Sequence, residues 1–235
     1  MPPECKLLAT VLFVVAVVAT PKEQFWAFGV LAALVVLAAL LGRVPLLVVA
    51  RRLVIEVPFL LFALLLPIVG RDRTVEVLGV HLSEPGLWAA WNIVAKGTIG
   101  VAASIVLAST TSVPHVLHGM ERLRVPRQLV AITGFMVRYG DVVGDELRRM
   151  RIARESRGAS ASRVGHARAV ATSAGALFVR SYERGERVYL AMASRGYVGS
   201  MPVRSGRATL RSWVVCLLWP TAAATVAALA WAAQR

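Results

Sequence analysis

The sequence lacks the residue patterns on which most enzymes and nucleotide-binding proteins depend. It contains no glycine-rich phosphate loop of the Walker type, no nucleophile elbow and no pair of carboxylates placed to face a cleft. Its two cysteines, Cys5 and Cys216, are too few for a disulfide framework or a metal cluster. We therefore expect a protein that is not an enzyme, has no cofactor and does not itself bind ATP.

Histidine is also scarce, with four residues in the chain. His115 and His118 have an i, i+3 spacing that would place two metal ligands on one helix face. No third ligand or general base lies near them in the sequence, as a zinc protease helix would supply. We interpret this segment as a plain interfacial helix, and an intramembrane metal site is the alternative.

Apolar sequence, in contrast, is abundant. Hydrophobic residues make up 57% of the 235 residues, and the mean hydropathy is +0.65, which is too apolar for a soluble domain of this size. The fold class that we predict is an all-α membrane protein with about five transmembrane helices and long amphipathic cytoplasmic helices. Four hydrophobic runs of bilayer-crossing length and one shorter first run occupy residues 25–41, 53–70, 87–108, 212–232 and 7–19.

The run at 7–19 has two interpretations. With Lys6 before it and small residues from Ala16 to Thr20, it could be a cleaved signal peptide. A lone lysine offset by Glu4 is a weak basic end, however, and we favour a helical hairpin that turns through 21–24.

The region at 53–70 contains an acid near its inner end, Glu56. An acid within a membrane span is a functional hypothesis by default. Because Glu56 is placed at a shallow depth, we expect it to reach the interface or to pair with Arg51 or Arg52. Three prolines in or near this region are expected to kink it: Pro45, Pro58 and Pro67.

Charge is unevenly placed along the chain, which has a net charge of +14. Residues 121–211 hold 18 basic and 7 acidic residues, a net charge of +11. The positive-inside rule then places 109–210, the loop at 42–52 and the N-terminus in the cytoplasm, and the loop at 71–86 and the C-terminus outside. With 24 arginines against 3 lysines, which suggests a GC-rich bacterial genome, we expect a multi-pass protein of the bacterial plasma (inner) membrane.

The predicted domain organisation has three parts. Transmembrane helices occupy 1–108, a cytoplasmic region with helices at the membrane's inner face occupies 109–210, and a closing transmembrane helix occupies 211–235. Within the middle part, hydroxyl, proline and glycine signals predict four helices and a semi-apolar segment. The helices are expected at about 113–123, 126–139, 146–157 and 182–195, and the segment at 167–180.

Two copies of Ser-Arg-Gly end predicted helices in this cytoplasmic region, as Ser156-Arg157-Gly158 and Ser194-Arg195-Gly196. An arginine in the last turn followed by glycine is an ordinary helix stop. Two copies with matched residues upstream, however, favour a pair of docking points for a two-part partner. An arginine at a helix tip offers a planar fork of donors to a carboxylate on another protein.

These copies belong to a longer series of motifs between residues 43 and 200. In chain order they are Thr110-Thr111, Met120-Glu121-Arg122-Leu123-Arg124-Val125-Pro126, Phe135-Met136-Val137-Arg138-Tyr139, Asp145-Glu146, Ala153-Arg154-Glu155-Ser156-Arg157-Gly158 and the block from Arg180 to Tyr197. The series resembles the transmembrane T component of energy-coupling factor (ECF) transporters, most closely the cobalt/nickel-type (CbiQ-like) branch. That family's paired signature is usually Ala-Arg-Gly, with a variable first position that is serine here.

The resemblance implies a non-catalytic subunit that joins two cytoplasmic ABC-type ATPases to a substrate-binding membrane S component, here for cobalt or nickel uptake. Arg157 and Arg195 would each dock into one ATPase, flanked by Ser156, Gly158, Ser194 and Gly196. The S component binds the substrate, so no metal ligands are required in this chain. Residues expected to support the coupling helices are Glu121, Arg138, Glu146, Glu183 and Arg187, and apolar faces at 113–123, 128–139 and 167–180 are expected to cradle the S component.

Two alternatives stay open at this point. One is a T component for a vitamin importer, serving biotin or several vitamins. The other is a membrane scaffold whose basic segment holds anionic lipid or nucleic acid. Acids interleaved with the basic residues, such as Glu146 and Glu183, argue against the scaffold, and we expect the lipid bilayer but no nucleic acid among the partners.

Overall fold

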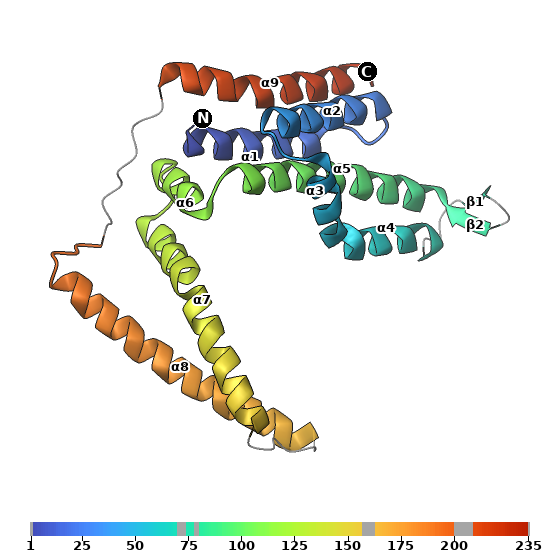
Figure 1. Cartoon of the computed structure of the whole chain (residues 1–235). Helices are drawn as coiled ribbons and strands as arrows, with labels where there is room; N and C mark the ends of the chain where they lie inside the picture. Colours follow the sequence, from blue (N-terminus) through green and yellow to red (C-terminus); the bar gives the residue numbers. More distant parts are fainter. Residues whose placement is uncertain (1, 70–73, 78–79, 157–162, 200–208, 235) are drawn as a thin grey trace. The chain divides into compact units, whose positions relative to one another are not determined.

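The computed structural model describes residues 2–69, 74–77, 80–156, 163–199 and 209–234. Within these ranges the chain consists of helices joined by short turns, and one short hairpin (Figure 1). Proximity of Cα atoms divides it into two compact units, residues 1–119 with 206–235 and residues 120–205. The three-part division made from the sequence stays a prediction.

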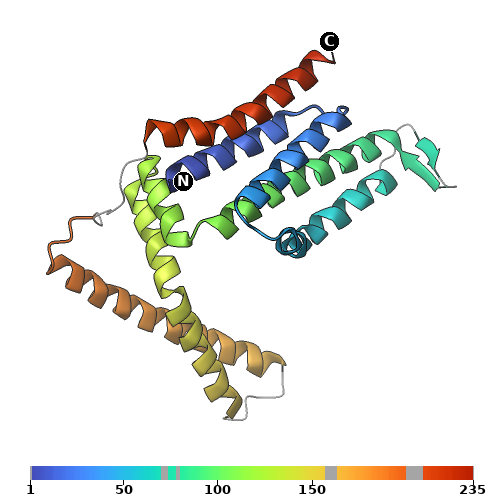
Figure 2. The same cartoon turned by 45° about the horizontal axis from the view of Figure 1, so that its top comes forward.

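The first unit contains most of the apolar helices (Figures 1 and 2). The hydrophobic runs at 7–19, 25–41, 87–108 and 212–232 each form one helix, as predicted. The elements of this unit are α1 (Pro3–Ala19), α2 (Phe25–Leu41), α3 (Leu46–Arg52), the 3₁₀ turn η1 (Leu53–Glu56), α4 (Val57–Val69), α5 (Glu84–Thr110) and α9 (Leu210–Ala232). Helix α6 (Val113–Arg122) follows α5 at the boundary of the unit.

Four of these helices share one apolar core. Phe13 of α1, Leu31 of α2, Ile99 of α5 and Ala223 of α9 are all buried in it. The α9 contribution is a small residue, which allows helix backbones to approach closely in a membrane.

Polar contacts at the helix ends fix the helix directions. The Lys6 Nζ donates to the carbonyl of Thr110 at 3.1 Å, so the start of α1 lies beside the end of α5. The Trp231 Nε1 donates to the carbonyl of Ala19 at 2.9 Å, so α9 runs parallel to α1. The chain therefore leaves this unit after α5 and returns to it at the start of α9 on the same side.

The outer surface of the first unit carries many large apolar side chains, and their exposure to water would be unfavourable. Leu41 is 74% exposed, Leu47 81% and Leu64 67%, and many further leucines and valines also face outward. Such surface is stable when it faces lipid and is an aggregation liability in water. Helices α5 and α9 are long and apolar enough to cross a membrane. The chain is an all-α membrane protein.

The region at 53–70 differs from the single kinked span that the sequence predicts. It divides into η1 and α4, and α3 precedes it, with Pro45 just before α3 and Pro58 in the first turn of α4. Helix α4 has 13 residues and is about 20 Å long, shorter than the ~30 Å hydrocarbon core. It packs against the outer part of α5 (Figure 2).

The prediction that Glu56 pairs with Arg51 or Arg52 was wrong, and its predicted membrane depth stays a prediction. Its side chain is buried, with 4% of the residue exposed, and accepts a hydrogen bond from the Thr98 Oγ1 at 3.2 Å, near the middle of α5. Arg52 instead donates to the Ser109 Oγ at 2.9 Å, and within the described residues Glu56 forms no ion pair with an arginine. The reason is the break at η1, which turns the Glu56 side chain toward α5. A β-carbon on Gly97 would lie 2.5 Å from the Glu56 Oε1, so a larger residue at this position would displace the end of the Glu56 side chain.

A short antiparallel hairpin occupies the loop predicted between the third and fourth spans. Strand β1 (Thr74–Val77) pairs with β2 (Val80–Ser83), and Thr74 lies opposite Ser83. Ser83 then caps α5 by accepting a hydrogen bond from the amide of Gly86.

The second unit is formed by two long helices, α7 (Arg127–Ser156) and α8 (Arg163–Ala193). The prediction of separate helices at 126–139 and 146–157 was wrong, as was that of a separate segment at 167–180. The residues near Gly140 are largely exposed and helical, so they form the middle of one continuous helix. Helix propensity is only a weak prior, and isolated glycines are tolerated at such positions.

Candidate functional site

The second Ser-Arg-Gly copy, Ser194-Arg195-Gly196, closes α8. The amide of Gly196 donates to the carbonyl of Ala193 at 3.0 Å, and the amide of Tyr197 donates to the carbonyl of Met192 at 3.0 Å. Gly196 has a φ of 81°, in the left-handed region. This is a Schellman cap, in which the left-handed residue follows the C-cap and two otherwise unpaired carbonyls are satisfied. The predicted helix stop at Gly196 is confirmed.

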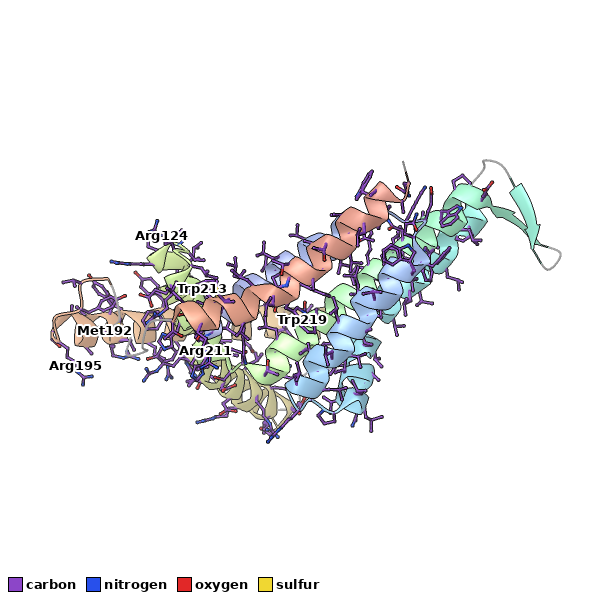
Figure 3. All side chains as sticks on the ribbon, turned by 90° about the horizontal axis from the view of Figure 1, so that it is seen from above. Arg124, Met192, Arg195, Arg211, Trp213 and Trp219 are labelled. Atoms are coloured by element: carbon purple, nitrogen blue, oxygen red, sulfur yellow. The ribbon has the colours of Figure 1, made fainter. Side chains whose placement is uncertain are left out.

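Arg195 occupies the C-cap position of α8. Figure 3 shows its side chain at the end of the helix, close to Met192. The residue is exposed, and within the described part of the chain it forms no ion pair. The carbonyl end of a helix carries partial negative charge, which stabilises a cation there. The guanidinium group is therefore held at a defined helix tip with its donors available to another molecule.

The same cap ends two other helices, with a different residue in the left-handed position. Arg43 follows α2 with a φ of 53°, and Arg124 follows α6 with a φ of 63°. In both places the arginine itself adopts the left-handed conformation, which costs about 1–2 kcal/mol for a residue with a β-carbon. Only in α8 does a described cap of this type combine arginine at the C-cap with glycine after it. In α8, glycine takes the left-handed position, so Arg195 at the C-cap does not have to adopt the strained backbone conformation.

The first copy, Ser156-Arg157-Gly158, is described in part. Helix α7 ends at Ser156, while Arg157 and Gly158 lie outside the described residues. The Ser156 Oγ donates to the carbonyl of Ala153 at 3.0 Å. The Ser194 Oγ makes the same bond to the carbonyl of Ala191, also at 3.0 Å. The two serines therefore have matching local geometry, which agrees with the match in sequence.

Helix α8 lies between the two copies. Its 31 residues correspond to a length of about 46 Å, at 1.5 Å per residue. Ser156 is the last residue of α7, and Arg195 follows the C-terminal end of α8.

Two of the predicted supporting acids form ion pairs in the second unit. The Glu146 Oε1 lies 2.5 Å from the Arg180 Nη1, which joins α7 to α8. Glu183 and Arg187 lie 4.0 Å apart, one turn from each other on α8. Arg180 begins the motif block that ends at Tyr197, but it was not predicted to support the coupling helices. Nothing in the local pattern indicates a partner 34 positions away.

The other two supporting residues have no comparable role in the described structure. Arg138 is exposed on α7, and Glu121 lies in the last turn of α6, where its carbonyl accepts from the amide of Arg124 at 3.2 Å. Nearer the end of α7, Glu155 lies 2.8 Å from Arg151, and this carboxylate raises the pKa of the Arg151 guanidinium. The predicted support by Glu121 and Arg138 stays a prediction.

His115 and His118, the candidate metal ligands of the sequence analysis, both lie on α6. The His115 Nδ1 lies 2.6 Å from the Ser112 Oγ, at the start of α6, where a hydroxyl group is a common helix-capping residue. Across the described ranges, no group of three His, Cys, Asp or Glu side chains is placed to hold a metal ion.

Comparison with known proteins places the chain in a family. Residues 1–204 match the family model CbiQ, described as a cobalt transport protein. The chain is 30% identical over 189 residues to the cobalt transport protein CbiQ of Rhodobacter capsulatus, covering 80% of this chain and 75% of that one. It is also 25% identical over 205 residues to an uncharacterized protein of Methanocaldococcus jannaschii, covering 83% and 70% of the two chains. The chain therefore belongs to the CbiQ family of cobalt transport proteins.

Proposed function

We propose that this chain is the transmembrane energy-coupling (T) subunit of an ECF-type ABC importer, which passes ATP-driven motion from two cytoplasmic ATPases to a membrane S component that binds cobalt. The observation that carries the proposal is the geometry of Arg195. An exposed guanidinium without an ion pair in the described residues stands on a firmly capped helix end. Membership of a cobalt transport family supports the proposal, because a transporter component fits a membrane complex with other subunits.

In this mechanism the two arginines are the points at which force enters the chain. Arg195 donates to a carboxylate on one ATPase, and Arg157 does the same on the other. When ATP binding closes the ATPase pair, the tips move and α7 and α8 transmit the motion as rigid rods. The S component then reorients and exposes its substrate to the cytoplasm. The arginines act through contacts that differ between two states of the complex, so they should matter more for transport than for folding.

The proposal includes a multi-pass topology in the bacterial plasma membrane, with the N-terminus and residues 109–210 in the cytoplasm. Two observations support it. The chain leaves the first unit beside Lys6 and returns beside it, so both ends of the intervening segment are on one side. Arg52 also lies on that side, bonded to Ser109, as the positive-inside rule requires for the cytoplasmic face.

Cobalt is the proposed substrate because the Rhodobacter capsulatus relative is named as a cobalt transport protein. The ion is bound by the S component, so this chain has no catalytic or metal-binding role. The same architecture would serve nickel, and identification of the S component distinguishes the ions from a vitamin substrate.

Co-purification from membranes tests the proposal. The tagged chain is purified in mild detergent and its partners are identified by mass spectrometry, for wild type, Arg195→Glu and the double variant Arg157→Glu, Arg195→Glu. Arg184→Glu is a matched control, since Arg184 is exposed on the same helix and has no ion pair among the described residues. We expect an ABC-type ATPase and a small multi-span protein with wild type and with Arg184→Glu.

The double variant should retain the small membrane protein and lose the ATPase, because only the docking contacts have been reversed in charge. Recovery of no ATPase with wild type, or full recovery with the double variant, would refute the coupling role. The scaffold alternative predicts a different result: the partners would dissociate equally from all variants as the salt concentration is raised. That result would indicate binding through diffuse charge on the basic segment.

A further inference from the structure

The contact between α7 and α8 buries little apolar surface. No residue of α7 falls in the buried class, and many of its large apolar side chains are exposed. The half-buried positions follow helical spacing along one stripe of each helix, Val143, Glu146 and Met150 on α7 and Ser173, Leu177 and Ser181 on α8. Apolar packing of this extent gives only a weak preference for one crossing geometry, because the hydrophobic contribution scales with the area buried.

One charged contact lies within this stripe. Glu146 has a side chain that is 26% exposed, and its Oε1 is 2.5 Å from the Arg180 Nη1. The other ion pairs of the described second unit, Arg151 with Glu155 and Arg187 with Glu183, each lie within one helix. The Glu146–Arg180 pair is thus the described ion pair that links the two helices across their crossing.

The pair divides each helix into a crossing part and a free arm. From Arg180 to Ser194 there are 14 residues, about 21 Å of helix, ending at the tip that carries Arg195. From Glu146 back to Arg127 there are 19 residues, about 28 Å of helix. Figures 1 and 2 both show the two arms diverging from the crossing. A displacement at Arg195 therefore reaches the N-terminal arm of α7 through the crossing at which this pair lies.

We propose that the Glu146–Arg180 ion pair is the pivot of the coupling helices, a positioning contact that keeps α7 and α8 at a fixed crossing so that motion at Arg195 is passed on to the α7 arm. The pair binds neither ATP nor substrate, and this role rests on the proposed coupling function. Without the pair, the helices slide or rotate at their weakly packed contact. ATP hydrolysis then continues, but less of the motion is transmitted.

A charge exchange tests the pivot in the intact importer. Arg180→Glu, Glu146→Arg and the double exchange of both residues are compared with wild type and with the control Arg184→Glu. The readouts are the amount of co-purified ATPase and the cobalt taken up per ATP hydrolysed. We expect each single variant to retain its ATPase and to lose about fivefold in uptake per ATP, equivalent to the ~1 kcal/mol upper value of an exposed pair at 1.4 kcal/mol per factor of ten.

The double exchange should restore uptake per ATP, because it restores an opposite-charge pair at the same positions. A residue needed only for folding would lower the amount of complex without changing this ratio. Single variants that match wild type, or a double exchange that fails to recover while the complex is intact, would overturn the proposal.

A second measurement on the purified chain does not depend on the ATPases. Spin labels at Met136 on α7 and Tyr189 on α8, both exposed, report the spread of the two arms in a variant without Cys5 and Cys216. We expect a broader distance distribution in Arg180→Glu and a narrow one in the double exchange. An unchanged distribution would overturn the pivot, whereas a broadened one in a chain that recovers no ATPase would leave the pivot standing and remove the coupling function.

Discussion

The cap at Gly196 provides a quantitative test of the candidate docking tip. Gly196 has a φ of 81°, and a β-carbon added there would meet no atom within 4 Å. The cost of Gly196→Ala is therefore conformational and not steric. A left-handed residue with a β-carbon costs about 1–2 kcal/mol, which corresponds to about 5- to 30-fold in an equilibrium constant.

The chain can respond to this cost in two ways. It can accept the strain, as it does at Arg43 and Arg124, or it can open the cap and lose the bonds that Gly196 and Tyr197 donate to α8. An opened cap leaves Arg195 on a disordered helix end, and the ordering must then occur on binding. In that case the affinity for the ATPase falls by about 5- to 30-fold.

The assay is a titration of purified ATPase onto the chain in nanodiscs, with circular dichroism to confirm that the helices are intact. We expect the affinity to decrease in the order Gly196, Gly196→Asn, Gly196→Ala, because asparagine tolerates the left-handed region better than alanine. Gly185→Ala is the control, since Gly185 lies within α8 with open space around it and should bind as wild type. Equal affinity of Gly196→Ala and wild type would refute the argument that the capped tip is needed for docking.

Further predictions concern the membrane unit, and thermal unfolding in detergent measures each of them. Gly86→Ala places a β-carbon 2.7 Å from the carbonyl oxygen of Leu66 and should destabilise the chain by about 1–3 kcal/mol, whereas Gly100→Ala on the same helix meets nothing and should be neutral or slightly stabilising. Equal effects would mean that α4 and α5 do not approach so closely. Thr98→Val removes the donor to the buried carboxylate of Glu56 and should cost about 0.6–1.7 kcal/mol, whereas Glu56→Gln keeps an acceptor and should cost less. A larger loss in Glu56→Gln would indicate an ionic role for Glu56 that this hydrogen bond does not explain.

Continuous apolar runs were the part of the fold that the sequence predicted best. Helix α2 coincides with the predicted run because its apolar residues continue without interruption from Phe25 to Leu41. The region at 53–70 was predicted less well, since hydropathy records how apolar a segment is and not whether its backbone is continuous. The break at η1 was therefore not predicted, and neither was the hydrogen bond between Glu56 and Thr98.

The candidate site was predictable where its geometry is local. Gly196 was expected to end a helix because glycine tolerates the left-handed conformation that a Schellman cap requires. The partnership of Glu146 with Arg180 was not predictable, because it depends on which exposed faces of α7 and α8 meet. The first copy at Arg157 lies outside the described residues, so its docking role stays a prediction.

Cobalt uptake by the Arg195→Glu variant tests the central claim most directly. The variant and the Arg184→Glu control are expressed in cells that carry the ATPases and the S component, and uptake is normalised to the amount of each chain in the membrane. The account predicts that Arg195→Glu abolishes uptake with normal membrane insertion, while Arg184→Glu transports as wild type. Normal uptake in Arg195→Glu, or an equal loss in Arg184→Glu, would contradict the claim that force enters the chain through the capped tip of α8.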